Sequence, residues 1–480
     1  MSTQRLKRKA TDDQQLRGRR RGRDQARLNI GNLFLGADMR NLRIGLTILT
    51  TTTVTLVGIH AVPAAATAPT TTRVSVSSSG TQANNHSGGR GISPDGRWVA
   101  FASEATNLVP GDTNGRSDIF VRDRATGTTE RVSVATGGAQ STGAQFTVNS
   151  TDPVISADGR YVAFVSDAAN LVPGDTNFTD DVFLRDRTAG TTTRISVSTA
   201  GAEGDYPSYE PTISADGRYI AYTSWATNLV PGDENWYSDI MLWDRIAATT
   251  TRISVSTTGG DTYGESRQPA ITPDGRYVAF TSTAPNMTTP PTNNYDEIFV
   301  RDLATATTSA MSYATNGAEA NSDSYRPAIS ADGRYVSYYS YATNLVAGDT
   351  NGRYDIFLRD RVTATTTRIS VATGGAQANM DSYTSAISAD GRYVVFDSGA
   401  TNLVAGDTNG YLWDVYLRDR VAGTTTRISV STAGTQGDSQ TGGPSISANG
   451  RLIFFSGVAT NLVPNDTNGA ADVFLRDLGT

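Results

Sequence analysis

One short text recurs seven times along this chain and limits what the chain can fold into. Its first copy reads Ser-Pro-Asp-Gly-Arg-Trp-Val-Ala-Phe, residues 93–101. The third residue of the text recurs at intervals of 63, 58, 58, 58, 58 and 59 residues, at Asp95, Asp158, Asp216, Asp274, Asp332, Asp390 and Asn449. A fixed period of this size is typical of β-propellers and solenoids.

Each repeat unit predicts four strands. In the second unit we expect them at residues 153–156, 160–165, 181–185 and 193–197. Asp158-Gly159 between the first two is a tight-turn dipeptide, because glycine accepts the positive φ that such turns need. The second and third strands are nearly continuous apolar runs, as expected when both faces of a sheet are covered.

The two ends of the repeat region complement one another. The seventh unit stops after its third strand at residues 472–476, and an isolated fourth strand stands at residues 72–76, before the first unit. Joining them completes the last blade and removes the open sheet edges that invite aggregation. The sequence therefore predicts an all-β, seven-bladed β-propeller of four-stranded blades, closed by an N-terminal strand that completes the last blade.

The text at residues 93–101 and the segment Asp-Ile-Phe-Val-Arg-Asp at 118–123 resemble the repeat of the TolB-like propellers, also called PD40 or WD40-like. The resemblance covers all seven units, about residues 71–480. It implies four-stranded blades, a cell-envelope setting and a role in protein contacts. The chain departs from TolB itself, because the predicted cleavage site leaves no room for a separate domain ahead of the propeller.

Residues 1–66 have the order of a secretory signal peptide. A long basic region precedes a mostly apolar stretch at 44–62 and a small-residue site, with cleavage expected after Ala66. An uncleaved membrane anchor is the alternative. We expect the propeller, residues 67–480, to be secreted, periplasmic or attached to the cell envelope, with no stable membrane span after cleavage.

Charge and composition exclude several functions. Residues 67–480 carry 29 basic and 43 acidic side chains, a formal net charge of −14, which disfavours nucleic acid and anionic lipid as partners. The chain has no cysteine, and the propeller has no lysine and a single histidine, His86. Thiol and lysine nucleophiles and histidine-rich metal centres are therefore excluded there.

The loop between the second and third strands carries the element Asp-x-Asn followed by an acid. Alternating oxygen side chains of this kind suit a hard cation, so we expect calcium as a candidate cofactor. Asx-turns of the same residues are the alternative, and the two interpretations stay open. The fourth unit has lost the element, reading Pro291-Thr292-Asn293 and ending in Glu297. The candidate ligands are Asp112, Asn114, Asp118, Asp175, Asn177, Asp181, Asp233, Asn235, Asp239, Asp349, Asn351, Asp355, Asp407, Asn409, Asp414, Asp466, Asn468 and Asp472.

Aromatic side chains gather in the loops expected on the same face. Aromatics among carboxylates are suited to stacking on sugars or to anchoring a protein partner. Gap filling between blades is the alternative for any single tyrosine. The candidate ligand-binding residues are Tyr206, Tyr209, Trp236, Tyr237, Tyr354, Tyr411 and Trp413.

These features favour a binding module for an envelope or extracellular protein or glycan over an enzyme. No Gly-x-Ser-x-Gly elbow is present. A glycosidase or polysaccharide lyase that uses paired loop carboxylates remains the alternative, because the separation of carboxylates cannot be read from sequence. No catalytic residue is assigned, and the sequence does not indicate an oligomeric state.

Overall fold

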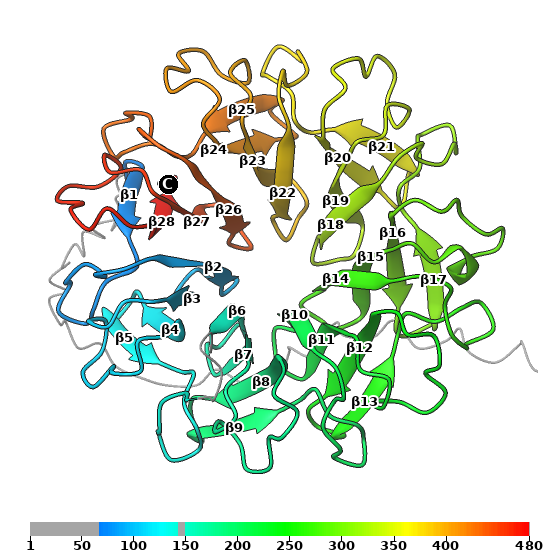
Figure 1. Cartoon of the computed structure of the whole chain (residues 1–480). Helices are drawn as coiled ribbons and strands as arrows, with labels where there is room; N and C mark the ends of the chain where they lie inside the picture. Colours follow the sequence, from blue (N-terminus) through cyan, green and yellow to red (C-terminus); the bar gives the residue numbers. More distant parts are fainter. Residues whose placement is uncertain (1–66, 143–148, 480) are drawn as a thin grey trace, which may run out of the picture. The chain divides into compact units, whose positions relative to one another are not determined.

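The computed structural model describes residues 67–142 and 149–479. They form seven separate four-stranded antiparallel sheets arranged in a ring (Figure 1), which confirms the predicted fold. The predicted signal peptide lies outside the described residues. Within the described ranges, no helix has the length and apolar character needed to cross a membrane.

The blades follow the chain order, and each runs from the centre of the ring outward (Figure 1). Blades 1 to 3 are β2–β5 (Ser87–Ile92, Trp98–Ser103, Asp118–Asp123, Thr128–Arg131), β6–β9 (Ser150–Ile155, Tyr161–Ser166, Asp181–Asp186, Thr191–Arg194) and β10–β13 (Ser208–Ile213, Tyr219–Ser224, Asp239–Asp244, Thr249–Arg252). Blades 4 and 5 are β14–β17 (Ser266–Ile271, Tyr277–Ser282, Glu297–Asp302, Thr307–Ala310), with the short 3₁₀ helix η1 (Pro285–Met287), and β18–β21 (Ser324–Ile329, Tyr335–Ser340, Asp355–Asp360, Thr365–Arg368). Blades 6 and 7 are β22–β25 (Ser382–Ile387, Tyr393–Ser398, Asp414–Asp419, Thr424–Arg427) and β26–β28 (Thr441–Ile446, Leu452–Gly457, Asp472–Asp477) with β1 (Thr70–Arg73).

In blade 2, two strand boundaries differ by three residues from those expected, and the others differ by two at most. The first strand of blade 2 begins three residues earlier than predicted, at Ser150, because a bulge lets the chain pair on both sides of Pro153. The fourth strand ends earlier than predicted, at Arg194. Beyond it, the Val182 N–H of the third strand donates its hydrogen bond to the Ser196 hydroxyl instead of to a backbone carbonyl, so the strand pairing stops there.

The predicted ring closure is present. β1 pairs antiparallel with β28, and Thr70 lies opposite Asp477. Seven buried apolar clusters hold the ring, and each draws its side chains from two neighbouring blades. The imidazole of His86 supports the closure, since its Nδ1 accepts a hydrogen bond from the Ala471 N–H.

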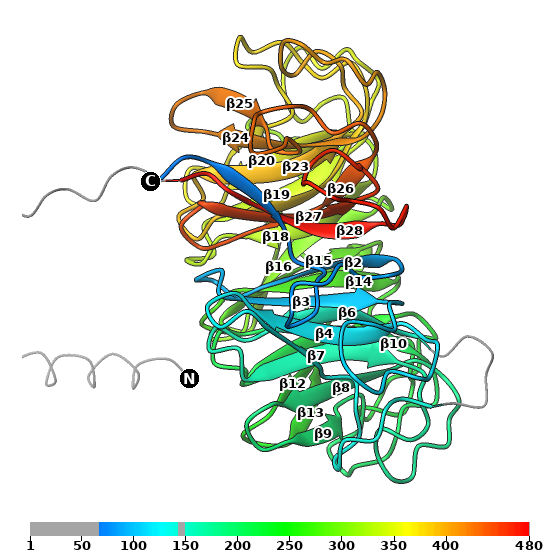
Figure 2. The same ribbon diagram turned by 90° about the vertical axis from the view of Figure 1, so that its left-hand side faces the viewer.

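The two faces of the ring differ in their connections. Because the strands of a blade are antiparallel, the long second-to-third loops and the links between blades emerge on one face, which we call the loop face. Figure 2 shows the sheets from the side. The opposite face carries the short turns. There the arginine that follows the turn between the first and second strands pairs with the aspartate that ends the third strand, as Arg160 does with Asp186 at 2.7 Å.

Candidate functional site

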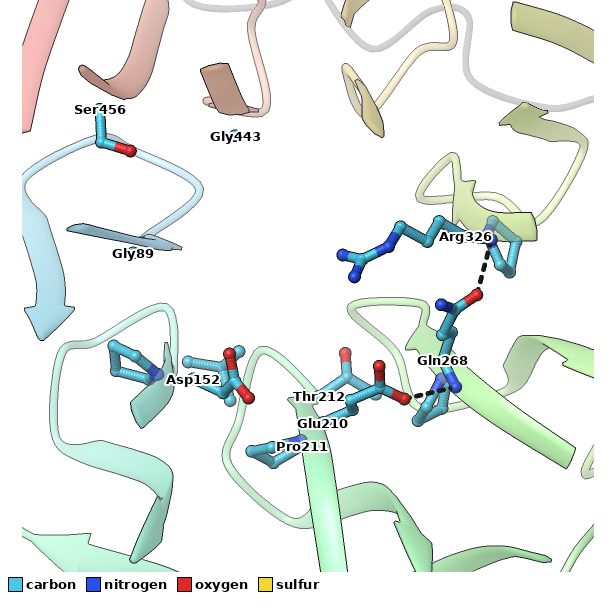
Figure 3. A pocket seen from close by; sticks show the side chains of 13 residues that line it. Gly89, Asp152, Glu210, Pro211, Thr212, Gln268, Arg326, Gly443 and Ser456 are labelled. Atoms are coloured by element: carbon cyan, nitrogen blue, oxygen red, sulfur yellow. Dashed lines mark hydrogen bonds between the residues drawn. The ribbon is translucent and has the colours of Figure 1, made fainter. Parts of the chain in front are cut away.

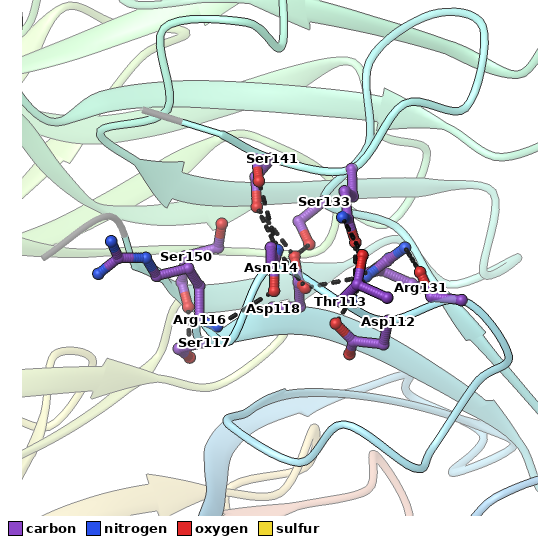
Figure 4. Close-up of polar contacts among 12 residues, drawn as sticks. Asp112, Thr113, Asn114, Arg116, Ser117, Asp118, Arg131, Ser133, Ser141 and Ser150 are labelled. Carbon is purple, nitrogen blue, oxygen red and sulfur yellow. Dashed lines mark hydrogen bonds and ion pairs between the residues drawn. The ribbon is translucent and has the colours of Figure 1, made fainter. Parts of the chain in front are cut away.

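The predicted metal ligands surround an arginine. In blade 1, Arg131 at the end of β5 lies 3.0 Å from Asp112 and 3.2 Å from Asp118 (Figure 4). Asp118 is fully buried, and its carboxylate also accepts hydrogen bonds from Asn114 and Ser133. We call this set, one arginine between two aspartates, the arginine clamp.

The clamp recurs in six of the seven blades. Each of its arginines lies 3.0–3.3 Å from both of its aspartates. The other five sets are Arg194 with Asp175 and Asp181, Arg252 with Asp233 and Asp239, Arg368 with Asp349 and Asp355, Arg427 with Asp407 and Asp414, and Arg73 with Asp466 and Asp472.

In the clamps the guanidinium supplies the positive charge that the carboxylates need. Burial raises the pKa of Asp239 to about 6, and Ser254 and Arg252 oppose that shift by stabilising the carboxylate. A calcium ion between the same oxygens would face a fixed cation at close range, so these six sets as arranged do not fit one. Among the described residues, no three His, Cys, Asp or Glu side chains form a set that could hold a metal. Calcium in these loops stays an untested prediction.

The predicted aromatic residues of blades 2 and 3 form an exposed group. Trp236 is 69 % exposed, and its ring meets that of Tyr206 edge on, with centroids 6.2 Å apart. Trp236 has φ +59° and Phe178, at the same repeat position, has φ +56°. Glycine holds this left-handed position in four other units, so these two side chains add backbone strain of about 1 kcal/mol each without filling the core.

A second aromatic group lies across blades 5 and 6. Tyr354 and Trp413 come from the loops, and Tyr383 stacks on Trp413 with centroids 5.1 Å apart. We call the whole group the tyrosine cluster; its neighbouring ring centroids are 5.1–5.6 Å apart, and its members are Tyr325, Tyr339, Tyr341, Tyr354, Tyr383 and Trp413. Asp381 lies beside it and accepts a hydrogen bond from the Tyr354 N–H.

The remaining predicted ligand-binding residues are not equivalent. Tyr237 and Tyr411 are exposed on the loops. Tyr209 is half-buried and packs against the apolar cluster between blades 2 and 3, as the gap-filling alternative expects. Tyr339 and Tyr341 were not identified from sequence, because they lie at and just beyond the end of a regular second strand, where the repeat pattern predicts only packing.

The structure has a hollow at the centre of the ring that was not predicted from the sequence. A cavity of about 530 Å³ lies among the first strands, lined by Asp152, Glu210, Gln268 and Arg326 on one side and by Gly89 and Gly443 on the other (Figure 3). The four polar residues occupy the bulge of each strand and have φ between +49° and +58°. The proline after each of them is the sequence signal for the bulge, since proline inside a strand marks broken pairing.

Two of these bulge side chains have a structural role. The bulge frees a backbone N–H, and the neighbouring blade supplies the acceptor: Glu210 accepts from the Gln268 N–H at 2.8 Å, and Gln268 accepts from the Arg326 N–H at 3.0 Å (Figure 3). Arg326 points its guanidinium into the cavity.

Comparison with known proteins identifies the fold and no family. No protein-family model and no curated protein matches the sequence. An oligogalacturonate lyase solved in complex with manganese is similar, with a TM-score of 0.52 and 14 % sequence identity. The match covers 85 % of this chain and 93 % of that chain. Also similar are a putative TolB from Agrobacterium tumefaciens (TM-score 0.36, 17 % identity, 59 % and 80 %) and TolB from Acinetobacter baumannii (TM-score 0.38, 15 % identity, 80 % and 81 %). The likeness to the lyase supports the fold alone, a β-propeller, and the sheet topology gives it seven four-stranded blades.

Proposed function

We propose that this chain is an exported, TolB-like interaction module that binds a glycan or a protein of the cell envelope through its loop face. The observation that carries the proposal is Trp236. A large apolar ring, mostly exposed and held on strained backbone where other units use glycine, gains little for the fold. Exposed aromatics of this kind act as anchors in binding sites.

Neighbouring features support the same face. Tyr206 extends the aromatic surface beside Trp236, Phe178 is exposed at the same repeat position of the preceding blade, and the tyrosine cluster offers a second aromatic area on blades 5 and 6. The acidic charge of residues 67–480 favours neutral glycans or cationic protein segments over anionic ligands.

The test uses Trp236→Gly, which installs the residue that four other units carry. The variant relieves strain, so we expect equal or higher thermal stability together with binding at least about tenfold weaker. Binding is measured by retention on immobilised polysaccharides and envelope proteins. Ile246→Ala, which removes a similarly exposed apolar side chain from a short turn of the opposite face, is the matched control.

Two results would count against the proposal. Unchanged retention by Trp236→Gly would remove its anchor, and no retention of any ligand by the parent protein would remove the function. If the protein releases soluble product from a polysaccharide, and if this activity is lost when one loop carboxylate is replaced by its amide, the glycosidase or lyase alternative is supported instead.

A further inference from the structure

Blade 4 lacks the cation that the six clamped blades share. The repeat position of the clamp arginine is Ala310, and the loop aspartate is replaced by Pro291. The buried acid that opens the third strand is nevertheless kept, lengthened by one methylene, as Glu297.

Glu297 is fully buried and poorly compensated. Neither of its carboxylate oxygens accepts a hydrogen bond of normal geometry from the described residues, although Ser312 and Asn293 lie within reach of the carboxylate and oppose the rise of its pKa. Burial raises the pKa of Glu297 to about 8, and the nearby Glu319 adds to the shift. An isolated buried carboxylate is among the least favourable groups in a protein interior.

Blade 2 shows which group lies between the residues equivalent to Glu297 and Glu319. There the equivalent residues are Asp181 and Glu203, and one nitrogen of Arg194 lies 3.3 Å from the first and 2.9 Å from the second. In blade 4 no guanidinium of the described residues pairs with the equivalent acids, Glu297 and Glu319. Tyr313 replaces the valine of other units, and its hydroxyl donates to Glu319 at 3.0 Å, which leaves Glu297 unneutralised.

We infer that blade 4 holds one small hard cation, of the calcium class, between Glu297 and Glu319, where the other blades hold a guanidinium. The atoms available there as metal ligands are carboxylate and hydroxyl oxygens, which such ions prefer. Only two acidic ligands are present, so the affinity is expected in the range of about 0.1–1 mM, as in weak extracellular sites. The unit that lost the Asp-x-Asn element is thus the one that takes the ion.

The experiment measures calcium binding by the full chain after chelation and dialysis. Equilibrium dialysis with calcium is expected to give one ion per chain, and about 5 mM calcium is expected to raise the melting temperature by about 2 °C. Glu297→Gln removes the charged ligand and Ala310→Arg supplies the missing guanidinium, so both variants are expected to lose the bound ion and the shift.

Asp175→Asn in the clamp of blade 2 is the matched control and should keep the ion and the shift, since its clamp already contains Arg194. Absence of bound calcium in the parent protein would overturn the inference and leave Glu297 as a protonated acid. Binding that survives both blade 4 variants would also overturn it and would place the ion elsewhere, the Asp-x-Asn loops included.

Discussion

Blades 2 and 4 have four strands of the same lengths and opposite solutions for a buried acid. In blade 2, Asp181 is fully buried beside Arg194 and accepts a further hydrogen bond from Ser196. In blade 4, Glu297 is equally buried, and no arginine among the residues that the structure describes pairs with it. The fold therefore needs the polar side chain that opens the third strand, while the means of neutralising it can vary.

The same comparison extends to the contacts between blades. In six blades a buried threonine of the fourth strand donates its hydroxyl to a carbonyl of the preceding blade, as Thr192 does to Val134. These threonines are Thr71, Thr129, Thr192, Thr250, Thr366 and Thr425. Thr308 of blade 4 is only half-buried. Clamp and inter-blade contact are thus altered in the same blade.

The largest effect is expected when a clamp is broken. Arg194→Ala leaves Asp175 and Asp181 buried without their cation, so we expect a loss of about 3–5 kcal/mol in unfolding free energy at pH 8. The loss should shrink at pH 5, where the orphaned carboxyls take up protons. Urea unfolding at both pH values measures it. Arg353→Ala, whose guanidinium lies 3.9 Å from Asp381 at the surface, is the control and should change little. An equal, small change in both variants would contradict a structural role for the clamp.

An intermediate effect of opposite sign is expected in blade 4. Because the pKa of Glu297 is raised to about 8, its ionisation opposes folding increasingly as pH rises from its unfolded value, near 4.5, towards 8. In metal-free buffer Glu297→Gln should therefore stabilise the protein at pH 8, by an amount up to the order of 4 kcal/mol, and change little at pH 4. Unfolding curves across this range measure the difference. Destabilisation by the variant at pH 8 would show that the carboxylate is compensated in solution.

The smallest effect concerns the threonines. Thr192→Val removes a buried hydroxyl donor while keeping the shape, so a loss of about 1 kcal/mol is expected. Thr308→Val in blade 4 should be nearly neutral. Thermal unfolding of the two variants side by side makes the measurement, and equal losses would mean that the junction before blade 4 is held as the others are.

Much of the fold could be predicted from the repeat alone. The period, the Asp-Gly turns and the complementary ends predict seven four-stranded blades and their closure, because each depends on local turn chemistry and apolar pattern. The first strand of each blade was harder to predict from the sequence, because Pro153 and its counterparts interrupt the strand pattern and the residues before the bulge are then not recognised as part of the strand. Pairing resumes beyond the bulge, and in blades 4 and 5 the neighbouring blade accepts the freed N–H, a contact between residues 58 positions apart.

The candidate sites divide in the same way. The residue types of the Asp-x-Asn loops, and aromatics such as Trp236 and Trp413, are visible in the sequence. Their surroundings are not. Arg131 lies 13 residues after Asp118, and its charge reaches that acid only because adjacent strands of one sheet bring them together.

The sequence by itself thus determined the number of blades, their closure and which face carries the loops, because these follow from local turns and apolar period. The tertiary structure decided which buried acids have a cation. That depends on the three-dimensional neighbours of each carboxylate, and the strength of a charge interaction is set by distance and burial, which a linear spacing does not contain.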